Sequence, residues 1–250
     1  MLEIEIFSDA ICPWCFIGKR RLEAALCDEN SDIDPNVTLR WRPYMLYPNL
    51  PAQGADRAEM LRRRFGPRGD KGRVPAAILA EAASQHIELR YDLIERTPNT
   101  RMAHRLVEWV GQTLGWQAQH EIVESLFQAY FCDGKDVGDF TTVAALAQPY
   151  GLHGRQAPQV LQGSGELGER LNEEIDIQLH RATELGVCGV PGYVMGVLGT
   201  SAQYRRVQSS CRPTPFKPAF AKTSYPKGGP SRGSLWDHLA YFGFGFEVLE

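Results

Sequence analysis

Cys12-Pro13-Trp14-Cys15 decides the fold, because it stands between a predicted strand and a predicted helix. Residues 2–7 alternate apolar and polar side chains, which is typical of a half-buried strand. In residues 16–26, apolar side chains recur at helical spacing, and Pro13 suits the first helical turn, where a missing N–H costs little. Cys12 is therefore expected in a strand-to-helix turn, with Cys15 one helical turn further on.

This position predicts thiol–disulfide chemistry. A thiol at a helix N-terminus lies at the positive end of the helix dipole, which favours the thiolate and predicts a lowered pKa for Cys12. Cys15 is then placed to attack a mixed disulfide formed at Cys12. A zinc site would need a second ligand pair, and a structural disulfide across so short a loop stabilises little. The other cysteines are scattered: Cys27, Cys132, Cys188 and Cys211.

The overall composition excludes several other classes of protein. The chain has 250 residues, 43% of them hydrophobic, which is ample for a core. Its net charge of −3 argues against nucleic-acid binding, which needs a basic excess. No apolar run reaches transmembrane length, and the first strand begins too early for a signal peptide, so a cytoplasmic protein without a membrane partner is expected. In a reducing compartment the paired cysteines favour catalysis over a structural bond.

The order of predicted elements gives the fold class. A second strand over 36–43 and a loop over 47–54 follow the first helix, and a last strand begins after Pro191 at 192–197. Helices are predicted between them at 56–65, 75–85, 99–114, 122–131, 141–150 and 167–182. This is an α/β fold of the thioredoxin type with a large helical insertion. The core is assigned to residues 1–50 and 186–203, and the insertion to residues 51–185.

Several motifs match one family in order along the chain: residues 8–21 around the two cysteines, 41–48, 98–106, 126–137 and 186–191. On these motifs the chain resembles the DsbA-like thioredoxin-fold family, specifically its FrnE-type cytosolic branch. Kappa-class glutathione transferases and 2-hydroxychromene-2-carboxylate isomerases are relatives, but they typically carry serine where Cys12 stands. The retained cysteine pair therefore favours the oxidoreductase side of the family.

The resemblance also implies further residues of the site. A cis peptide bond before Pro191 would lie against Cys12 and present the backbone of Val190 to a substrate, with Pro13 and Trp14 beside the sulfur. Asn99 is expected near the glutathione or substrate site, although it also suits the cap of the helix after Pro98. Glutathione is expected as a co-substrate, with no bound cofactor and no metal.

Other candidates have an ordinary structural explanation as well. His104 is a possible titrating group or a satisfied helix histidine. Cys188, close to the expected position of Cys12, is a third thiol or an inert one. Lys19, Arg20 and Arg21 would attract an anionic thiol, or form a solvated helix face.

The expected function is a cytosolic thiol–disulfide oxidoreductase acting on protein or small-molecule disulfides and dithiols. Two alternatives stay open: a glutathione-dependent transferase or isomerase acting on a small electrophile, and a redox-inert binding module. The insertion is expected to wall a cleft over Cys12.

The C-terminal part, residues 204–250, departs from the family pattern and is expected to be a divergent, partly disordered tail. Residues 212–233 are rich in proline, glycine, serine and lysine, which predicts disorder. Without the usual closing hairpin strand, the strand at 192–197 would have an unpaired edge. The aromatic residues 241–248 are expected to return and cover the sheet.

Overall fold

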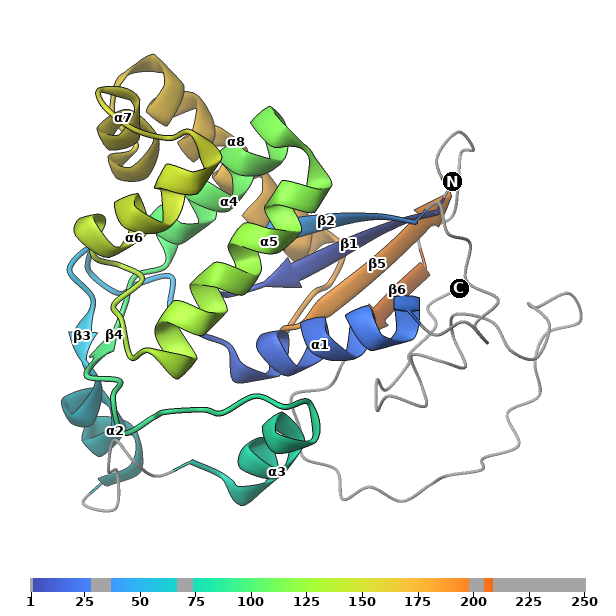
Figure 1. The fold of residues 1–250 in the computed structure, drawn as a ribbon, viewed down its shortest axis with the longest axis vertical. Helices are drawn as coiled ribbons and strands as arrows, with labels where there is room; N and C mark the ends of the chain where they lie inside the picture. The colour runs from blue at the N-terminus through green and yellow to red at the C-terminus, as the bar shows by residue number, and fades with distance from the viewer. Residues whose placement is uncertain (1, 28–36, 67–73, 198–204, 209–250) are drawn as a thin grey trace, which may run out of the picture.

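The computed structural model describes residues 2–27, 37–66, 74–197 and 205–208 (Figure 1). Four strands form the main sheet in the order β2-β1-β5-β6. Their bounds are β1 (Leu2–Ser8), β2 (Val37–Pro43), β5 (Gly192–Val197) and β6 (Arg205–Gln208). β1 pairs in parallel with β2, whereas β5 is antiparallel to both β1 and β6. Helix α1 (Pro13–Cys27) makes the crossover from β1 to β2.

The pairing of β6 with β5 corrects one prediction. Residues 205–208 add a fourth, antiparallel strand beside β5, so the hairpin strand that was expected to be missing from this edge is present. Four residues are too short for a strand pattern to be recognised in the sequence, since they show barely two alternations. The expectations for residues 212–233 and 241–248 lie outside the described residues.

A helical module lies between β2 and β5 in the chain, and Figure 1 shows it gathered at one side of the sheet. Its two-stranded ribbon consists of β3 (Ala55–Asp56) and β4 (Arg96–Thr97). Its helices are α2 (Arg57–Phe65), α3 (Ala76–Ser84), α4 (Arg101–Leu114), α5 (Trp116–Phe127), α6 (Phe140–Ala147), α7 (Gln156–Gln162) and α8 (Gly165–Glu184). A π-helical turn, Gln128–Cys132, extends α5. The six predicted helices are present, and α7 and the ribbon were not predicted.

Aromatic rings join α1 to the helical module. The Phe16 ring stacks on Phe127, with centroids 5.1 Å apart, and on Phe131 at 6.2 Å. Trp41 of β2 meets Phe127 edge-on at 6.4 Å. All four side chains are buried, and each such pair contributes about 1 kcal/mol beyond the apolar area it buries. The first turn of α1 is therefore packed against α5 and the π-helical turn that follows it.

Ion pairs tie the next turn of α1 to the same module. Lys19 is only 2% exposed, and its ammonium lies 2.5 Å from Glu23 and 2.9 Å from Glu124 of α5. Arg20 also pairs with Glu124, and Arg21 pairs with Glu81 of α3. The burial of Lys19 contradicts the interpretation of a solvated helix face at this residue, whereas Arg20 keeps 36% of its side chain exposed. Their charges are used within the protein.

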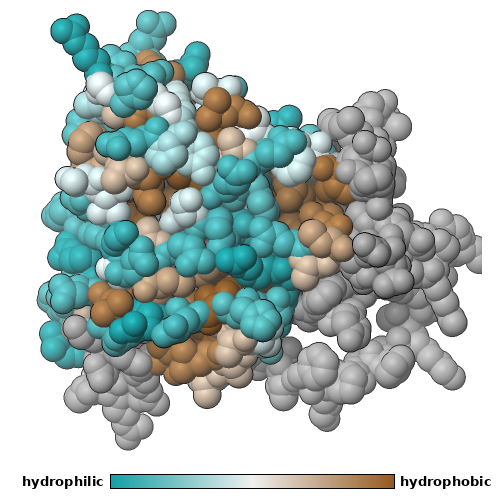
Figure 2. Space-filling model, viewed as in Figure 1, coloured by the Kyte–Doolittle hydropathy of each residue, from teal (hydrophilic) through white to brown (hydrophobic). Residues whose placement is uncertain are grey.

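The surface carries its exposed apolar side chains on different elements. Figure 2 shows one face that is mostly hydrophilic, with apolar areas separated from one another. Within the described residues, the large exposed apolar side chains are Leu46, Phe65, Leu79, Leu93, Leu114 and Ile177. Single exposed apolar residues are ordinary on a folded surface. No helix of the described part combines the length and the apolar content needed to cross a bilayer.

Candidate active site

The turn between β1 and α1 positions Cys12 at the start of the helix. The Cys12 amide donates to the Asp9 carbonyl at 3.0 Å, which closes the turn. The Cys12 carbonyl then accepts from the amides of Cys15 at 3.1 Å and Phe16 at 3.3 Å, as a residue that caps a helix does. Pro13 is the first residue of α1. The local geometry is the one that the Cys-Pro-Trp-Cys stretch predicts.

Both thiols are free and buried, and the segment that leads into β5 lies against Cys12. Cys12 is 3% exposed and Cys15 is fully buried. The Cys12 thiol donates to the carbonyl oxygen of Val190 at 3.5 Å. The Val190–Pro191 peptide bond is cis. Two segments almost 180 residues apart in the chain thus meet at one sulfur atom.

The pKa of Cys12 differs from the prediction. Burial, together with the neighbouring Cys15 thiol, raises the pKa of Cys12 well above its ordinary value. The Cys15 amide does favour the thiolate, as expected at a helix start, but burial outweighs it. A lowered pKa is therefore wrong for this closed arrangement, because the sequence shows the helix start and does not show how deeply the sulfur is buried.

Asp9 is a member of this site that the sequence reasoning missed. Its carboxyl group is fully buried, and burial raises its pKa to about 6. The Leu46 amide donates to Asp9 Oδ2 at 2.7 Å and opposes that rise. The negative charge of Asp9 in turn adds to the rise in the pKa of Cys12. The sequence contained one signal for this residue: Asp9 is a carboxylate that lies three residues before the first cysteine.

His104 brings the helical module to the same turn. Its Nε2 lies 3.1 Å from the Tyr44 carbonyl and 3.8 Å from Asp9 Oδ1. Burial lowers the pKa of His104 to about 4, so the ring is neutral near pH 7. Nε2 must therefore carry the proton that it donates to Tyr44. His104 is a satisfied buried histidine that also lies against Asp9.

The other candidate residues from the sequence lie in different parts of the structure. Pro13 and Trp14 are half-buried beside Cys12, and Cys188 is exposed on the loop before Pro191. The Asn99 amide nitrogen donates to the Leu50 carbonyl at 2.7 Å, and its oxygen accepts from the Arg101 amide at 3.0 Å. Asn99 thus fastens a loop and the start of α4, which is the structural role that its position also suggested.

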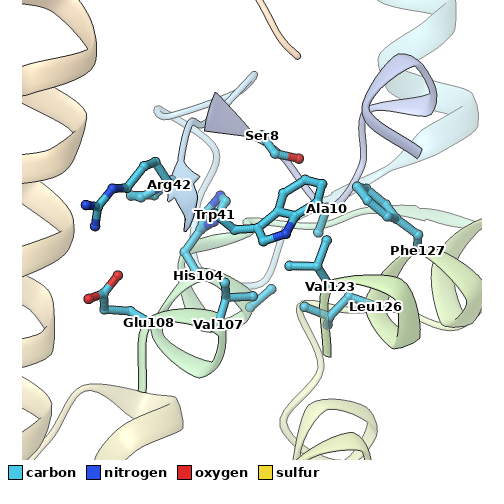
Figure 3. A pocket seen from close by; sticks show the side chains of 12 residues that line it. Ser8, Ala10, Trp41, Arg42, His104, Val107, Glu108, Val123, Leu126 and Phe127 are labelled. Atoms are coloured by element: carbon cyan, nitrogen blue, oxygen red, sulfur yellow. The ribbon is translucent and has the colours of Figure 1, made fainter. Parts of the chain in front are cut away.

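A small cavity lies between the sheet and the helical module (Figure 3). Arg42 and Glu108 lie at one end, and apolar side chains such as Val123 and Leu126 line the other. Its volume of about 20 Å³ holds about one water molecule. Ala10 lines this cavity and neither Cys12 nor Cys15 does, so the cavity lies beside the cysteine turn and not over it. In the described part of the chain, no three metal-ligating side chains gather.

The match to a family model agrees with this geometry. The model of the DSBA-like thioredoxin domain matches residues 3–203, and the chain therefore belongs to this family. The resemblance inferred from the motifs is confirmed, as is the α/β thioredoxin fold with a helical insertion.

Individual relatives are distant. The uncharacterized protein YwbO of Bacillus subtilis is 22% identical over 200 residues, which cover 78% of this chain and 87% of YwbO. A probable DsbA oxidoreductase from Streptomyces coelicolor has a TM-score of 0.63 at 24% identity, covering 78% of this chain and 80% of its own. The cytosolic disulfide reductase DsbM from Pseudomonas aeruginosa has a TM-score of 0.56 at 17% identity, covering 81% and 88%. These structures share the fold.

Proposed function

We propose that the protein is a thiol–disulfide oxidoreductase in which Cys12 exchanges with the substrate and Cys15 resolves the intermediate. One observation supports this proposal above all: the Cys12 thiol lies at the start of α1, one helical turn from Cys15, and donates a hydrogen bond to the Val190 carbonyl. The cysteine pair supplies two electrons for each disulfide that it reduces. A cytoplasmic location is consistent with the free thiols of Cys12 and Cys15 in this structure, because the cytoplasm keeps thiols reduced.

The exchange proceeds in two balanced steps. The Cys12 thiolate attacks one sulfur of a substrate disulfide, forming a mixed disulfide, while the other substrate sulfur leaves as a thiolate and takes up a proton. The Cys15 thiolate then attacks the Cys12 sulfur, and the second substrate thiol is released. Cys12 and Cys15 end as a disulfide, which two molecules of a thiol such as glutathione reduce again.

The buried site makes substrate approach part of this mechanism. Burial holds Cys12 in its thiol form, so the thiolate forms when the closed arrangement opens. We assign substrate contact to the residues beside the sulfur: Pro13, Trp14, Val190 and Pro191. We assign the thioredoxin core of the chain to residues 1–50 and 186–203. The insertion, residues 51–185, contributes His104 behind the turn and Asn99 as a loop support.

Glutathione is the thiol that we propose as co-substrate. The support is a likeness in fold: the DsbM reductase has also been solved with GSH, at a TM-score of 0.55 and 16% identity. The test is a glutathione-coupled disulfide reductase assay on the wild type, Cys12→Ser and Cys15→Ser. Turnover is expected for the wild type alone, and a Cys12→Ser variant with full activity would overturn the proposal.

A glutathione-dependent isomerase or transferase is the second candidate. A 2-hydroxychromene-2-carboxylate isomerase shares the fold, with a TM-score of 0.53 at 17% identity. Such chemistry does not need a resolving thiol. Cys15→Ser therefore separates the two candidates, because it abolishes catalytic disulfide reduction and leaves isomerase activity intact. A redox-inert binding module would show neither activity.

A further inference from the structure

Helix α4 carries a stripe of polar side chains from the interior of the helical module to its surface. His104, Glu108 and Gln112 follow one another at a spacing of four residues, so their side chains lie on one face of the helix. His104 and Glu108 are only 6% and 7% exposed, whereas Gln112 lies at the surface. The stripe therefore connects a buried histidine to solvent by way of a buried carboxylate.

The inner end of this stripe meets Asp9, whose backbone carbonyl closes the turn at Cys12. His104 Nε2 lies 3.8 Å from Asp9 Oδ1. In the neutral ring, Nε2 donates its proton to the Tyr44 carbonyl, so Nδ1 is the nitrogen that can accept one. A proton that arrives at Nδ1 would release the Nε2 proton, and a ring shift of about 1 Å would bring that proton into hydrogen-bond distance of Asp9.

Two adjoining cavities extend along the stripe. The cavity of Figure 3, with a volume of about 20 Å³, is lined by both His104 and Glu108. A second cavity, of about 40 Å³, is lined by Glu108 together with the exposed side chains of Gln112 and Arg40. The two cavities also share Arg42. Each has room for at least one water molecule among polar partners, so water can connect His104 through Glu108 to solvent.

Glu108 is suited to carry a proton because no cation holds its carboxylate. Among the described residues it forms no ion pair, and its oxygens accept from the neutral amides of Gln112 at 2.8 Å and Gln178 at 3.0 Å. Glu5, by contrast, is bound by two arginines. A carboxylate that faces neutral donors takes up a proton at a smaller electrostatic cost than one that is bound to cations.

Thiol–disulfide exchange in so closed a site needs a connection of this kind. When a disulfide between Cys12 and Cys15 is reduced, Cys15 leaves as a buried thiolate that must take up a proton. Solvent reaches little of the outer side of the turn, because Cys12 is only 3% exposed and a bound substrate would cover it further. The proton must therefore come from the side of the turn that the substrate does not cover.

We propose that Glu108 and His104 form a proton route through the helical module, by which protons from solvent reach Asp9 behind the cysteine turn. The inference rests on the proposed function for its purpose, which is to supply the proton that the leaving thiolate takes up. Each proton passes from solvent to Glu108, through water to His104 Nδ1, and from Nε2 to Asp9. Every carrier gives up one proton for each that it receives, so the transfer needs no other reactant.

The test compares Glu108→Gln with Glu174→Gln. Each change replaces a carboxylate that accepts from the Gln178 amide, at 3.0 Å and 2.6 Å, by a neutral amide of the same shape. Of the two glutamates, Glu108 alone lines the cavities. The measurement is the exchange of the His104 Nε2 proton with water, followed by NMR in the protein with isotope-labelled histidine. Glu108→Gln should slow this exchange at least about tenfold, and Glu174→Gln should change it less than about twofold.

Chemical rescue gives a second readout that a structural role would not move. In Glu108→Ala, added formate should restore the exchange because it carries a proton, whereas nitrate, a planar anion of similar size, should not. An unchanged exchange rate in Glu108→Gln would overturn the inference. Equal rescue by nitrate and formate would overturn it as well, because filling the space or restoring the charge would then be sufficient. Thermal melting checks that each variant folds.

Exchange at His104 does not depend on disulfide reduction, so this inference and the proposed function fail separately. If the wild type reduces disulfides and Glu108→Gln leaves the exchange unchanged, the route is refuted and the reductase stands. If the exchange slows as expected and the wild type reduces no disulfide, the reductase is refuted and the route stands. If both hold, reduction of the Cys12–Cys15 disulfide by excess thiol should be slower in Glu108→Gln and show a larger solvent deuterium isotope effect.

Discussion

Replacing Asp9 by asparagine is expected to stabilise the protein at neutral pH, although Asp9 lies at the centre of the site. The carboxyl group is fully buried, and its pKa is about 6 in the folded chain against an ordinary value of 3.8. The folded state thus holds the proton more tightly than the unfolded state does. Stability therefore falls as pH rises from about 4 through 6, and a shift of about 2 units corresponds to about 3 kcal/mol.

An asparagine carries no charge to bury, and its amide oxygen still accepts from the Leu46 amide, although its NH2 group cannot accept from the other donors around Asp9. Urea unfolding at pH 7.5 should show the Asp9→Asn variant more stable than the wild type by up to about 3 kcal/mol, with the gain shrinking towards pH 4. His104, whose low pKa makes stability fall as pH drops from about 6.5 to 4, lies 3.8 Å from Asp9 Oδ1, so its contribution differs between the two proteins below about pH 6.5, and the gain is therefore read at pH 7.5, where the ring is neutral.

Asp56→Asn is the matched control, since Asp56 caps α2 at the surface and asparagine caps equally well. It should show no such pH-dependent gain. A second readout concerns Cys12: without the nearby negative charge its pKa should fall, and thiolate absorbance should appear at lower pH. A variant less stable than the wild type at pH 7.5 would refute the reasoning, because it would mean that the hydrogen bonds of the carboxylate outweigh its burial.

Three other outcomes are expected. Lys19→Met should lower the free energy of unfolding in urea by about 2 kcal/mol. This loss is smaller than the loss from breaking a fully buried ion pair, because the glutamate partners of Lys19 are partly exposed. An unchanged urea midpoint would contradict this prediction. Gly54→Ala should lower the melting temperature by forcing a side chain at φ +70°, with its Cβ only 2.6 Å from a carbonyl oxygen of β4, and a melting temperature equal to the wild type would argue against it. Alkylation near neutral pH, mapped by mass spectrometry, should label the exposed Cys27 and Cys188 before the buried Cys12, and Cys15 last; earlier labelling of Cys15 than of Cys12 would count against the assigned roles.

The fold could be predicted from the sequence because its signals are local. The proline after Cys12 starts α1, and the regular apolar spacing of the insertion predicts its longer helices. The ribbon of β3 and β4 could not be predicted, since two residues in each strand show no periodicity. Strand β6 was missed for the same reason.

The site was predicted less completely than the fold, because burial depends on contacts between distant segments. The sequence indicated Cys12 and Cys15, but the raised pKa of Cys12 results from packing that no local pattern records. Asp9 was missed because ordinary turns contain the same residue type. Lys19 was misinterpreted because a cation beside other cations usually faces solvent.

The ion pairs of α1 limit how freely the helical module can be exchanged between relatives. Lys19 of α1 pairs with Glu23 of the same helix and with Glu124, a residue that the insertion supplies. A chimera that grafts a foreign insertion onto this core would leave the Lys19 ammonium buried without that carboxylate. The core and the insertion are therefore expected to be inherited together. In any recombinant, the insertion must supply a carboxylate that faces Lys19 of α1.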